Sequence, residues 1–325
     1  MEETVLPDNV VLGPAEGEDL ELEAAEPEEY CEELQGYWYN RFVKSFVKRP
    51  GQHLCEVGRT GTGKTQFLYW LVDLMRAHAP NESILWFDLG KGAEILTLAH
   101  YFGGLKIWTL PGCDVVVQSD EEYDIEYGRV LTCKGLWHQK LEPDRIHVAS
   151  FEPFILNPVE YTKQTSDLFV RLVYAAHRET VRRPLCLIFD EFHNVAPAAG
   201  YGFAGDRSAA AAQYQACNYI KRNVQKLRSQ GIRLVATTHE WSQLYRGVRT
   251  SFEWLVPRRG SKFMQDEPRL MDFNPRWARM ETEHAYIAFP NRMYGGPLRL
   301  PYYLDGGKLG RVKYEGISGE EEAKY

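Results

Sequence analysis

The sequence predicts an α/β protein in which a mainly parallel sheet is covered by helices on both faces. Two observations support this fold class: short apolar runs alternate with segments of helical period, and the runs are continuous instead of alternating with polar residues. Continuous apolar runs are typical of strands buried on both faces, and strands that alternate with helices favour a parallel sheet. The chain has 325 residues, 44% of them hydrophobic and 26% charged, which suits one large domain or two ordinary ones.

The first elements follow a segment at residues 38–49 that mixes aromatic and basic side chains. The run from His53 to Val57 predicts a strand, and a glycine-rich turn separates it from a helix. Apolar residues of that helix recur at i+3 or i+4 spacing, at Phe67, Leu71, Leu74 and Met75. Pro80 ends the pattern, and the run from Ile84 to Phe87 predicts a second strand.

Residues 104–150 contain short β segments between turn residues. These segments are Lys106–Thr109, Val115–Val117 and Arg145–Val148. We expect this stretch, about residues 104–150, to be an insertion or a β-rich extension of the core.

The later elements return to the α/β alternation. Residues 166–181 predict a helix, and Leu185–Phe189 predicts a strand buried on both faces. A long helix from Ala209 to Arg228 follows, with Gly231 as its C-cap. Ile232–Ala236 predicts another buried strand.

Charge divides the chain into a body and two tails. Residues 1–35 hold 13 acids and no Lys or Arg, and residues 315–325 hold four acids and one base. Residues 36–314 therefore hold 28 acids and 37 bases, a net charge of about +9. We interpret residues 1–35 as an acidic disordered arm, residues 36–310 as one domain, and residues 311–325 as a polar C-terminal tail. The arm is consistent with a solubilising tail, a DNA mimic or a docking segment for another protein.

The cysteines and the apolar runs bear on localisation. Six cysteines are scattered without a CxxC pair: Cys31, Cys55, Cys113, Cys133, Cys186 and Cys217. This spacing disfavours a zinc ribbon or a disulfide framework and suits a reducing cytosol. No apolar run approaches the roughly 20 residues of a membrane span, and the N-terminus lacks the pattern of a secretory signal. We expect a cytoplasmic protein without a membrane span.

The strongest motif is the segment Gly58-Arg59-Thr60-Gly61-Thr62-Gly63-Lys64-Thr65, which fits GxxxxGK[ST] in full. It stands between a predicted strand and a predicted helix, as a phosphate-binding Walker A loop requires. The glycines let successive backbone N–H groups point at phosphate oxygens, and the helix N-terminus adds positive potential. Lys64 is expected at the β- and γ-phosphates, and the Thr65 hydroxyl at Mg²⁺.

A second motif supplies acids for hydrolysis. Asp190 and Glu191 directly follow the buried run Leu185–Phe189. At the end of a central strand, Asp190 would hold the Mg²⁺ with its water shell, and Glu191 would orient or deprotonate the attacking water. The sequence therefore predicts an ATP and Mg²⁺ site.

One competing motif fails on its residues. His239-Glu240 begins like the HExxH motif of zinc proteases, but Gln243 stands where the second histidine is needed. We expect His193 and His239 beside the nucleotide instead.

Several segments together resemble the FtsK–HerA superfamily of ring-forming DNA-pumping ATPases. Besides the loop GRTGTGKT, they are Phe87-Asp88-Leu-Gly-Lys91-Gly, the run Ile188–Pro197 and the block Lys226–His239. The resemblance spans roughly residues 52–259. It implies a RecA-like P-loop NTPase core and a homo-oligomeric ring, most often a hexamer, that acts on double-stranded DNA independently of sequence.

The resemblance also implies roles for single residues. Arg228 matches the arginine finger that reaches the γ-phosphate of a neighbouring subunit, and Arg249 and Arg258 are alternatives for that role. His239 replaces the sensor glutamine of the family, with Thr238 as the alternative sensor. The catalytic set is thus Lys64, Glu191, Arg228 and His239.

A stripe of cations with interleaved aromatic residues follows between residues 246 and 262. The cations are Arg246, Arg249, Arg258, Arg259 and Lys262, and the aromatic residues include Tyr245, Phe252 and Trp254. Such a stripe suits phosphate contacts, although a solvated face or a subunit interface has the same pattern. Residues 201–213, rich in Gly and Ala, are a candidate pore loop or a plain linker.

The sequence thus favours an ATP-driven DNA translocase, with genome packaging by a virus or mobile element as the preferred role; in that case it would work in the host cytoplasm. Alternatives within the resemblance are HerA-like DNA end-processing and conjugation. An assembly or secretion NTPase acting on protein, similar to those of filamentous-phage assembly, is a different class, and a nucleotide-gated switch is a third.

Overall fold

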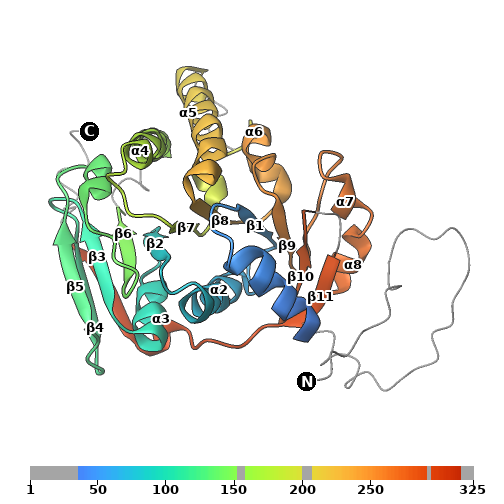
Figure 1. Cartoon of the computed structure of the whole chain (residues 1–325), viewed down its shortest axis with the longest axis horizontal. Coiled ribbons are helices and arrows are strands. Elements are labelled where there is room, and N and C mark those ends of the chain that lie inside the picture. Colours follow the sequence, from blue (N-terminus) through green and yellow to red (C-terminus); the bar gives the residue numbers. More distant parts are fainter. Residues whose placement is uncertain (1–35, 152–157, 200–206, 291–293, 316–325) are drawn as a thin grey trace, which may run out of the picture.

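The computed structural model describes residues 36–151, 158–199, 207–290 and 294–315. Its centre is a ten-stranded sheet with the order β11-β10-β9-β1-β8-β7-β2-β6-β3-β5 (Figure 1). From β9 to β5 every neighbouring pair of strands is parallel, whereas β10 and β11 add to one end as antiparallel strands. The prediction of a mainly parallel α/β fold is confirmed.

Strands β1, β2, β3, β6, β7 and β8 fall at or near predicted segments, whereas β5, β9, β10 and β11 were not predicted. The strands of the sheet are β1 (Leu54–Val57), β2 (Ser83–Asp88), β3 (Leu105–Thr109), β5 (Ile125–Arg129), β6 (Ile146–Ser150), β7 (Leu185–Phe189), β8 (Ile232–Thr238), β9 (Trp254–Pro257), β10 (His284–Ala288) and β11 (Tyr294–Arg299). Two further strands, β4 (Asp114–Ser119) and β12 (Gly310–Glu315), form a separate antiparallel pair.

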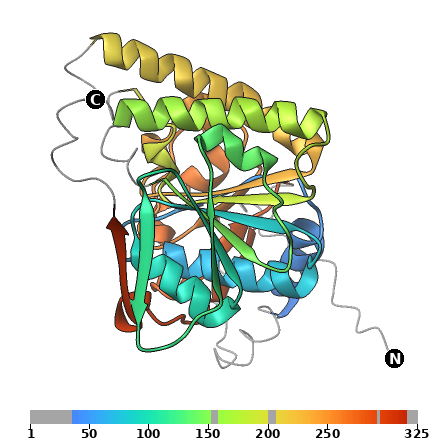
Figure 2. The ribbon, with the colours of Figure 1, turned by 90° about the vertical axis from the view of Figure 1, so that its left-hand side faces the viewer.

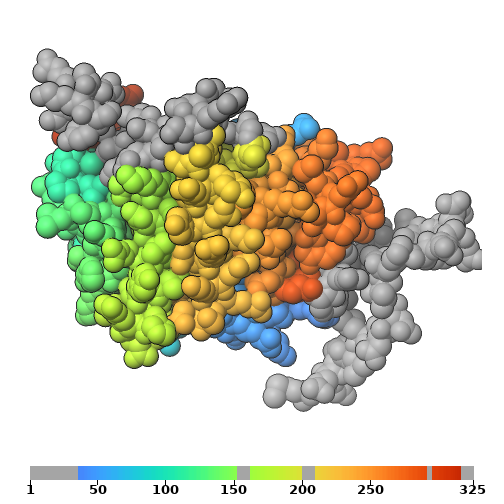
Figure 3. Space-filling view, turned by 90° about the horizontal axis from the view of Figure 1, so that it is seen from above, coloured from blue at the N-terminus to red at the C-terminus, as the bar shows by residue number. Residues whose placement is uncertain are grey.

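Helices cover both faces of the sheet. The longer ones are α2 (Lys64–His78), α3 (Gly92–Phe102), α4 (Pro158–His177) and α5 (Arg207–Leu227), and the short ones include α6 (Arg246–Arg249), α7 (Pro268–Met271) and α8 (Asn274–Arg279). Helices α2 and α3 lie on one face, and α4 and α5 lie on the other (Figures 1 and 2). On that second face α4 and α5 lie side by side on the surface, next to the segment that carries α6 and α7 (Figure 3).

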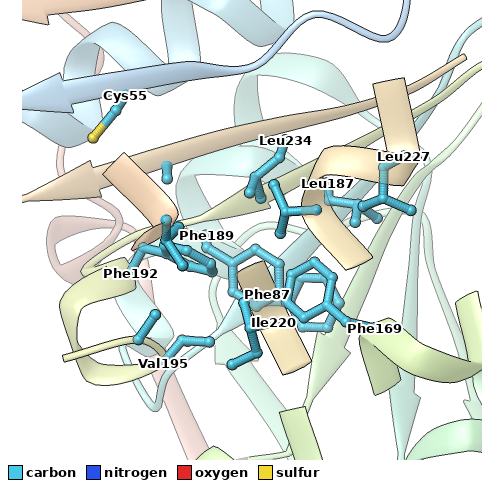
Figure 4. Close-up of a cluster of buried hydrophobic side chains, with 14 of the residues drawn as sticks. Cys55, Phe87, Phe169, Leu187, Phe189, Phe192, Val195, Ile220, Leu227 and Leu234 are labelled. Atoms are coloured by element: carbon cyan, nitrogen blue, oxygen red, sulfur yellow. The ribbon is translucent and has the colours of Figure 1, made fainter. Parts of the chain in front are cut away.

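Each face of the sheet has its own hydrophobic core. Along β7, Leu187 and Phe189 point to the core beneath α4 and α5, where Phe189 stacks on Phe87 with ring centroids 3.9 Å apart (Figure 4). Cys186 and Ile188 alternate with them and pack on the side of α2. Burial on both faces explains why this strand is a continuous apolar run.

Residues 104–150 extend the sheet. Strands β3, β5 and β6 from this stretch continue the parallel order beyond β2, so of the two forms that we expected the extension is the one observed. Only β4 leaves the sheet, to pair with β12. The sequence shows only short β segments here, because β4 and several loops separate strands along the chain that are neighbours in the sheet.

The assignment of residues 311–315 to a polar tail was wrong. They belong to β12, in which Val312 and Tyr314 alternate with exposed charged residues and pack against the core next to α2 and α3. Val312 lies directly over Gly92, where a Cβ would be only 2.4 Å from the valine Cβ. Two partly buried residues in a short polar segment were too weak a signal for a strand.

Other predictions concern residues whose placement is not described. The acidic arm at residues 1–35 lies outside the described residues, as do residues 201–206 of the candidate pore loop. Within the described part of the chain, no helix combines the length and the apolar character that crossing a bilayer requires.

Candidate functional site

The loop between β1 and α2 has the strand–loop–helix order that the sequence predicts. It leaves the sheet at Gly58, whose N–H donates to the carbonyl of Thr238 at the end of β8 (3.1 Å), and α2 begins at Lys64. Gly61 and Gly63 adopt positive φ angles of 76° and 78°, which L-residues rarely adopt. The predicted strand–loop–helix order is therefore present, with glycine where the turn requires it.

Arg258, which directly follows β9, packs against this loop and holds it by hydrogen bonds. Its guanidinium donates to the Thr62 carbonyl (2.6 Å) and to the Thr282 carbonyl (2.6 Å), and only 1% of the residue is exposed. A Cβ on Gly58 or Gly63 would lie 2.6 Å from an atom of Arg258, so close packing on Arg258 favours glycine at both positions, in addition to the positive φ at Gly63. The buried Glu56 carboxylate lies 3.5 Å from Arg258 Nε.

The structure corrects the predicted cationic stripe and the two alternative arginine fingers. Arg258 is buried under the loop, and Arg249 pairs with Asp266 and donates to the carbonyls of Leu244 (2.8 Å) and Ser242 (3.0 Å). Neither guanidinium is available to DNA or to a neighbouring subunit. Phe252 and Trp254 are also buried in the core. A sequence pattern shows the positions of the cations along the chain. It does not show which of them pair with acids or donate to carbonyls in the fold. Arg246, Arg259 and Lys262 remain exposed.

Four adjacent parallel strands bring the functional residues to one edge of the sheet. The order is β1-β8-β7-β2, and the residues that follow the carboxyl ends of these strands meet there. They are the loop after β1, His239 after β8, Asp190 and Glu191 after β7, and Lys91 after β2. Together with Lys64 and Thr65 they line one cavity of about 770 Å³.

The two acids are held in place by the backbone and by Thr237. The Glu191 N–H donates to Asp190 Oδ1 (3.1 Å) and to Thr237 Oγ1 (2.9 Å), and the Thr237 hydroxyl donates to Asp190 Oδ1. Glu191 has a left-handed backbone with φ of 53°, an uncommon conformation for a residue other than glycine and one that is enriched at functional sites. Asp190 is buried, while Glu191 reaches into the cavity.

Lys91 is the principal site residue that sequence reasoning missed. Its ammonium lies 2.7 Å from Asp190 Oδ2 and 2.7 Å from Glu191 Oε1, so that it bridges the two acids. Asp88 shapes the turn that carries it, because Asp88 Oδ1 accepts from the N–H groups of Gly90 and Lys91, both at 3.1 Å. The signal was the segment Asp88-Leu-Gly-Lys91 itself, which we used for the resemblance without giving the lysine a role.

The Lys91 bridge sets the ionisation of the acids. Burial by itself would raise the pKa of Asp190, but the charge and hydrogen bond of Lys91 outweigh it and lower that pKa below its usual value. The pKa of Glu191 is lowered for the same reason. Burial opposes the charge on Lys91 as well, yet the attraction of Asp190 and Glu94 raises the lysine pKa. Both acids are therefore ionised at neutral pH.

His239 lies where the sensor was expected. Its Nδ1 accepts from the Lys64 ammonium (3.0 Å), and its Nε2 lies 3.5 Å from Glu191 Oε1. Burial, followed by the charge of Lys64, lowers the pKa of His239, and burial with the charge of His239 lowers the pKa of His193 to about 4. These contacts assign a neutral His239 with its proton on Nε2, facing Glu191. Its sensor role stays a prediction.

The donor atoms of the cavity fit a magnesium ion. Thr65 and Asp190, the predicted ligands, are hard oxygen donors and line the same cavity, as Mg²⁺ prefers. The Lys91 ammonium between two carboxylates shows that this point of the cavity already stabilises positive charge. A second cluster, Glu191 with His193 and His239, has ligand atoms within 4.8 Å of one another, but two of its three ligands are nitrogens, which suit transition metals better than Mg²⁺.

Arg228 lies away from this cavity. It follows α5 and precedes β8, which places it at the amino end of that strand, the opposite edge of the sheet from the loop. Its side chain is 61% exposed and pairs with Glu253. An exposed arginine on that edge faces outward from its own subunit, so the role of a finger for a neighbour stays a prediction.

Comparisons with known proteins find similarity in structure. No protein-family model matches the sequence, and no curated protein matches it. The genome packaging NTPase B204 of Sulfolobus turreted icosahedral virus 2 aligns over 77% of this chain and 98% of its own, with 12% identity and a TM-score of 0.46. The bacterial conjugative coupling protein TrwB aligns over 84% of this chain and 93% of its own, with 12% identity and a TM-score of 0.47. The type VII secretion ATPase EccC of Thermomonospora curvata aligns over 80% of this chain and 26% of its own, with 15% identity and a TM-score of 0.43.

Proposed function

We propose that this protein is an ATP-driven DNA translocase of the FtsK–HerA type, with Mg²⁺-dependent ATP hydrolysis in a ring. The observation that carries the ATPase part is the convergence of Lys64, Lys91, Asp190, Glu191 and His239 on one cavity beside a glycine-rich loop. A lysine and two acids beside a backbone anion site suit phosphoryl transfer to water, because they can bind the phosphates, hold a metal ion and position the water.

Each side chain has a task that follows from its position. The N–H groups of residues 61–65 and the Lys64 ammonium bind the β- and γ-phosphates, and the start of α2 adds its positive end. Thr65 and Asp190 would hold Mg²⁺, which neutralises the charge that develops on the phosphate oxygens. Glu191 orients the attacking water and accepts its proton, and His239 Nε2–H donates toward Glu191 or the γ-phosphate.

The cavity needs a further cation, which a neighbour would supply. The one arginine that lines it among the described residues is Arg258, whose guanidinium is engaged with backbone carbonyls. A loose phosphoryl-transfer transition state gains from an arginine at the γ-phosphate. We assign that role to the exposed Arg228 of an adjacent subunit, and the resemblance makes a hexamer the expected ring.

Mixing two inactive variants tests the shared site. Lys64→Ala removes the phosphate ligand and Arg228→Ala the finger, so neither homogeneous ring hydrolyses ATP. Mixed rings contain some interfaces with both residues intact, and ATPase activity therefore returns at intermediate mixing ratios. Rings that form normally but stay inactive at every ratio would contradict a finger supplied in trans.

Charge supports DNA as the substrate. The body carries about +9, and Arg246, Arg259 and Lys262 are exposed cations on it. We expect double-stranded DNA of any sequence to stimulate the ATPase several-fold at low salt, with the effect lost as salt rises. ATP hydrolysis that DNA leaves unchanged at low salt would favour an assembly or secretion NTPase acting on protein. In the proposed translocase, the acidic arm at residues 1–35 would dock the motor on another component.

A further inference from the structure

A second cavity lies on the other side of the phosphate-binding loop. It has a volume of about 640 Å³ and is enclosed by the first half of the loop, the segment after β9 and the start of α8. The two cavities share Thr60, Gly61 and Thr282, so the loop is the wall between them. Strand β9 adjoins β1 on the side away from the acids (Figure 1).

Three exposed cations line this second cavity: Arg59 from the loop, and Arg259 and Lys262 from the segment after β9. Within the described part of the chain, none of the three has an ion-pair partner and no acidic side chain lines the cavity. Positive charge gathered from two chain segments without local compensation favours an anionic ligand.

The frame that carries these cations is fixed by hydrogen bonds. The Gly260 N–H donates to the Trp277 carbonyl (2.8 Å), and the Ser261 hydroxyl ties the turn to the Val57 and Arg258 carbonyls. The stem of Arg59 lies on Gly260, where φ is 73° and a Cβ would be 2.9 Å from Arg59 Cδ. Little backbone ordering is therefore needed when a ligand binds.

The other lining residues indicate the class of anion. They are Thr, Gly, Ser, Asn, Pro and Ala, and none is a large apolar or aromatic side chain. A nucleobase pocket and the centre of a protein interface both rely on such side chains. Cations with hydroxyl and amide donors instead match a sugar-phosphate backbone, for which arginine and threonine are common partners.

We propose that this second cavity binds the phosphodiester backbone of DNA, through Arg59, Arg259 and Lys262. The proposal rests on the proposed function and names one contact surface for its substrate. Since the same loop residues face both cavities, DNA bound there touches the loop that holds the β- and γ-phosphates. The site would thereby couple DNA contact directly to the nucleotide state.

The test compares two double variants that each remove one exposed arginine and one exposed lysine. Arg259→Ala with Lys262→Ala alters the cavity, and Arg311→Ala with Lys313→Ala alters β12, which pairs with β4 outside the ten-stranded sheet. Affinity for a mixed-sequence duplex is measured at 50 and 200 mM salt, and affinity for a fluorescent ATP analogue is measured in parallel. Two lost phosphate contacts lower the salt slope by about 1.8, so the ratio of wild-type to cavity-variant DNA affinity is about tenfold larger at 50 than at 200 mM. ATP-analogue binding stays within about twofold.

Distinct results separate the failures. DNA affinity equal in both double variants, while the wild type binds DNA, would overturn the cavity assignment and leave the translocase proposal standing. A parallel loss of ATP-analogue affinity would also overturn it, because the cavity would then belong to the nucleotide site. Binding of polyglutamate in place of DNA would reassign the cavity to an acidic protein. A wild type that hydrolyses ATP but binds no duplex at 50 mM would refute the DNA part of the proposed function itself.

Discussion

The bridge from Lys91 to Asp190 and Glu191 gives the sharpest test of the site. Lys91→Ala leaves two carboxylates facing each other at the end of β7, one of them buried, with no cation between them. Breaking a fully buried ion pair costs about 3 to 5 kcal/mol. The Lys91 side chain is 37% exposed, and solvent screening reduces the expected loss to about 2 kcal/mol. In a protein of this size that corresponds to a Tm lower by about 3 °C.

Magnesium distinguishes this explanation from a general loss of packing. A divalent cation can replace the missing ammonium between the acids, so 10 mM Mg²⁺ should restore most of the lost Tm in Lys91→Ala and raise the wild type less. Thermal melting with EDTA and with Mg²⁺ measures both effects. Lys91→Arg keeps the charge and serves as the conservative control, and Lys106→Ala removes a lysine of similar exposure from a surface pair with Glu126. An equal Tm loss in EDTA and in Mg²⁺ would refute the reasoning.

Three further predictions follow from buried contacts. Arg258→Ala should lower the free energy of unfolding, measured in urea, by about 3 kcal/mol or more, because the loop loses its hydrogen bonds to a buried guanidinium. The same variant should weaken nucleotide binding. Arg259→Ala, at the exposed neighbouring residue, should change the free energy of unfolding by less than about 0.5 kcal/mol. A Cβ at Gly61 meets no neighbouring atom, so Gly61→Ala should lower the free energy of unfolding only by the cost of a left-handed backbone, about 1 kcal/mol. A Cβ at Gly63 also contacts Arg258, so Gly63→Ala should lower it clearly more. Equal losses of stability in urea would contradict this account. Burial lowers the pKa of His53 to about 4, so the unfolded chain binds more protons between pH 6.5 and 4 and stability falls by roughly 3 kcal/mol across that window; urea unfolding of His53→Asn should show a flatter profile.

Sequence reasoning placed the central strands β1, β2, β7 and β8 and the loop after β1 well because their signals are local. The run Leu185–Phe189 is apolar at every position, and the loop Gly58–Thr65 needs glycine where φ is positive. Such signals depend on neighbours within a few residues, and the structure places them as expected. The interpretation of Arg249 and Arg258 failed because a guanidinium that donates to backbone carbonyls looks the same in the sequence as one in solvent. Their partners Asp266 and Thr282 come from other segments of the chain.

The sequence by itself determined the α/β alternation, the position of the glycine-rich loop Gly58–Thr65 and the positions of Asp190 and Glu191, because each signal lies in residues close together in the chain. Only the tertiary structure decided which residues meet around them. The order β1-β8-β7-β2 joins segments far apart in the chain. It places Lys91 beside Asp190 and Glu191, which follow about a hundred residues later in the sequence. Parallel strands bring their carboxyl ends to one edge of the sheet whatever their separation in sequence. At that edge the Lys91 ammonium balances the charges of Asp190 and Glu191.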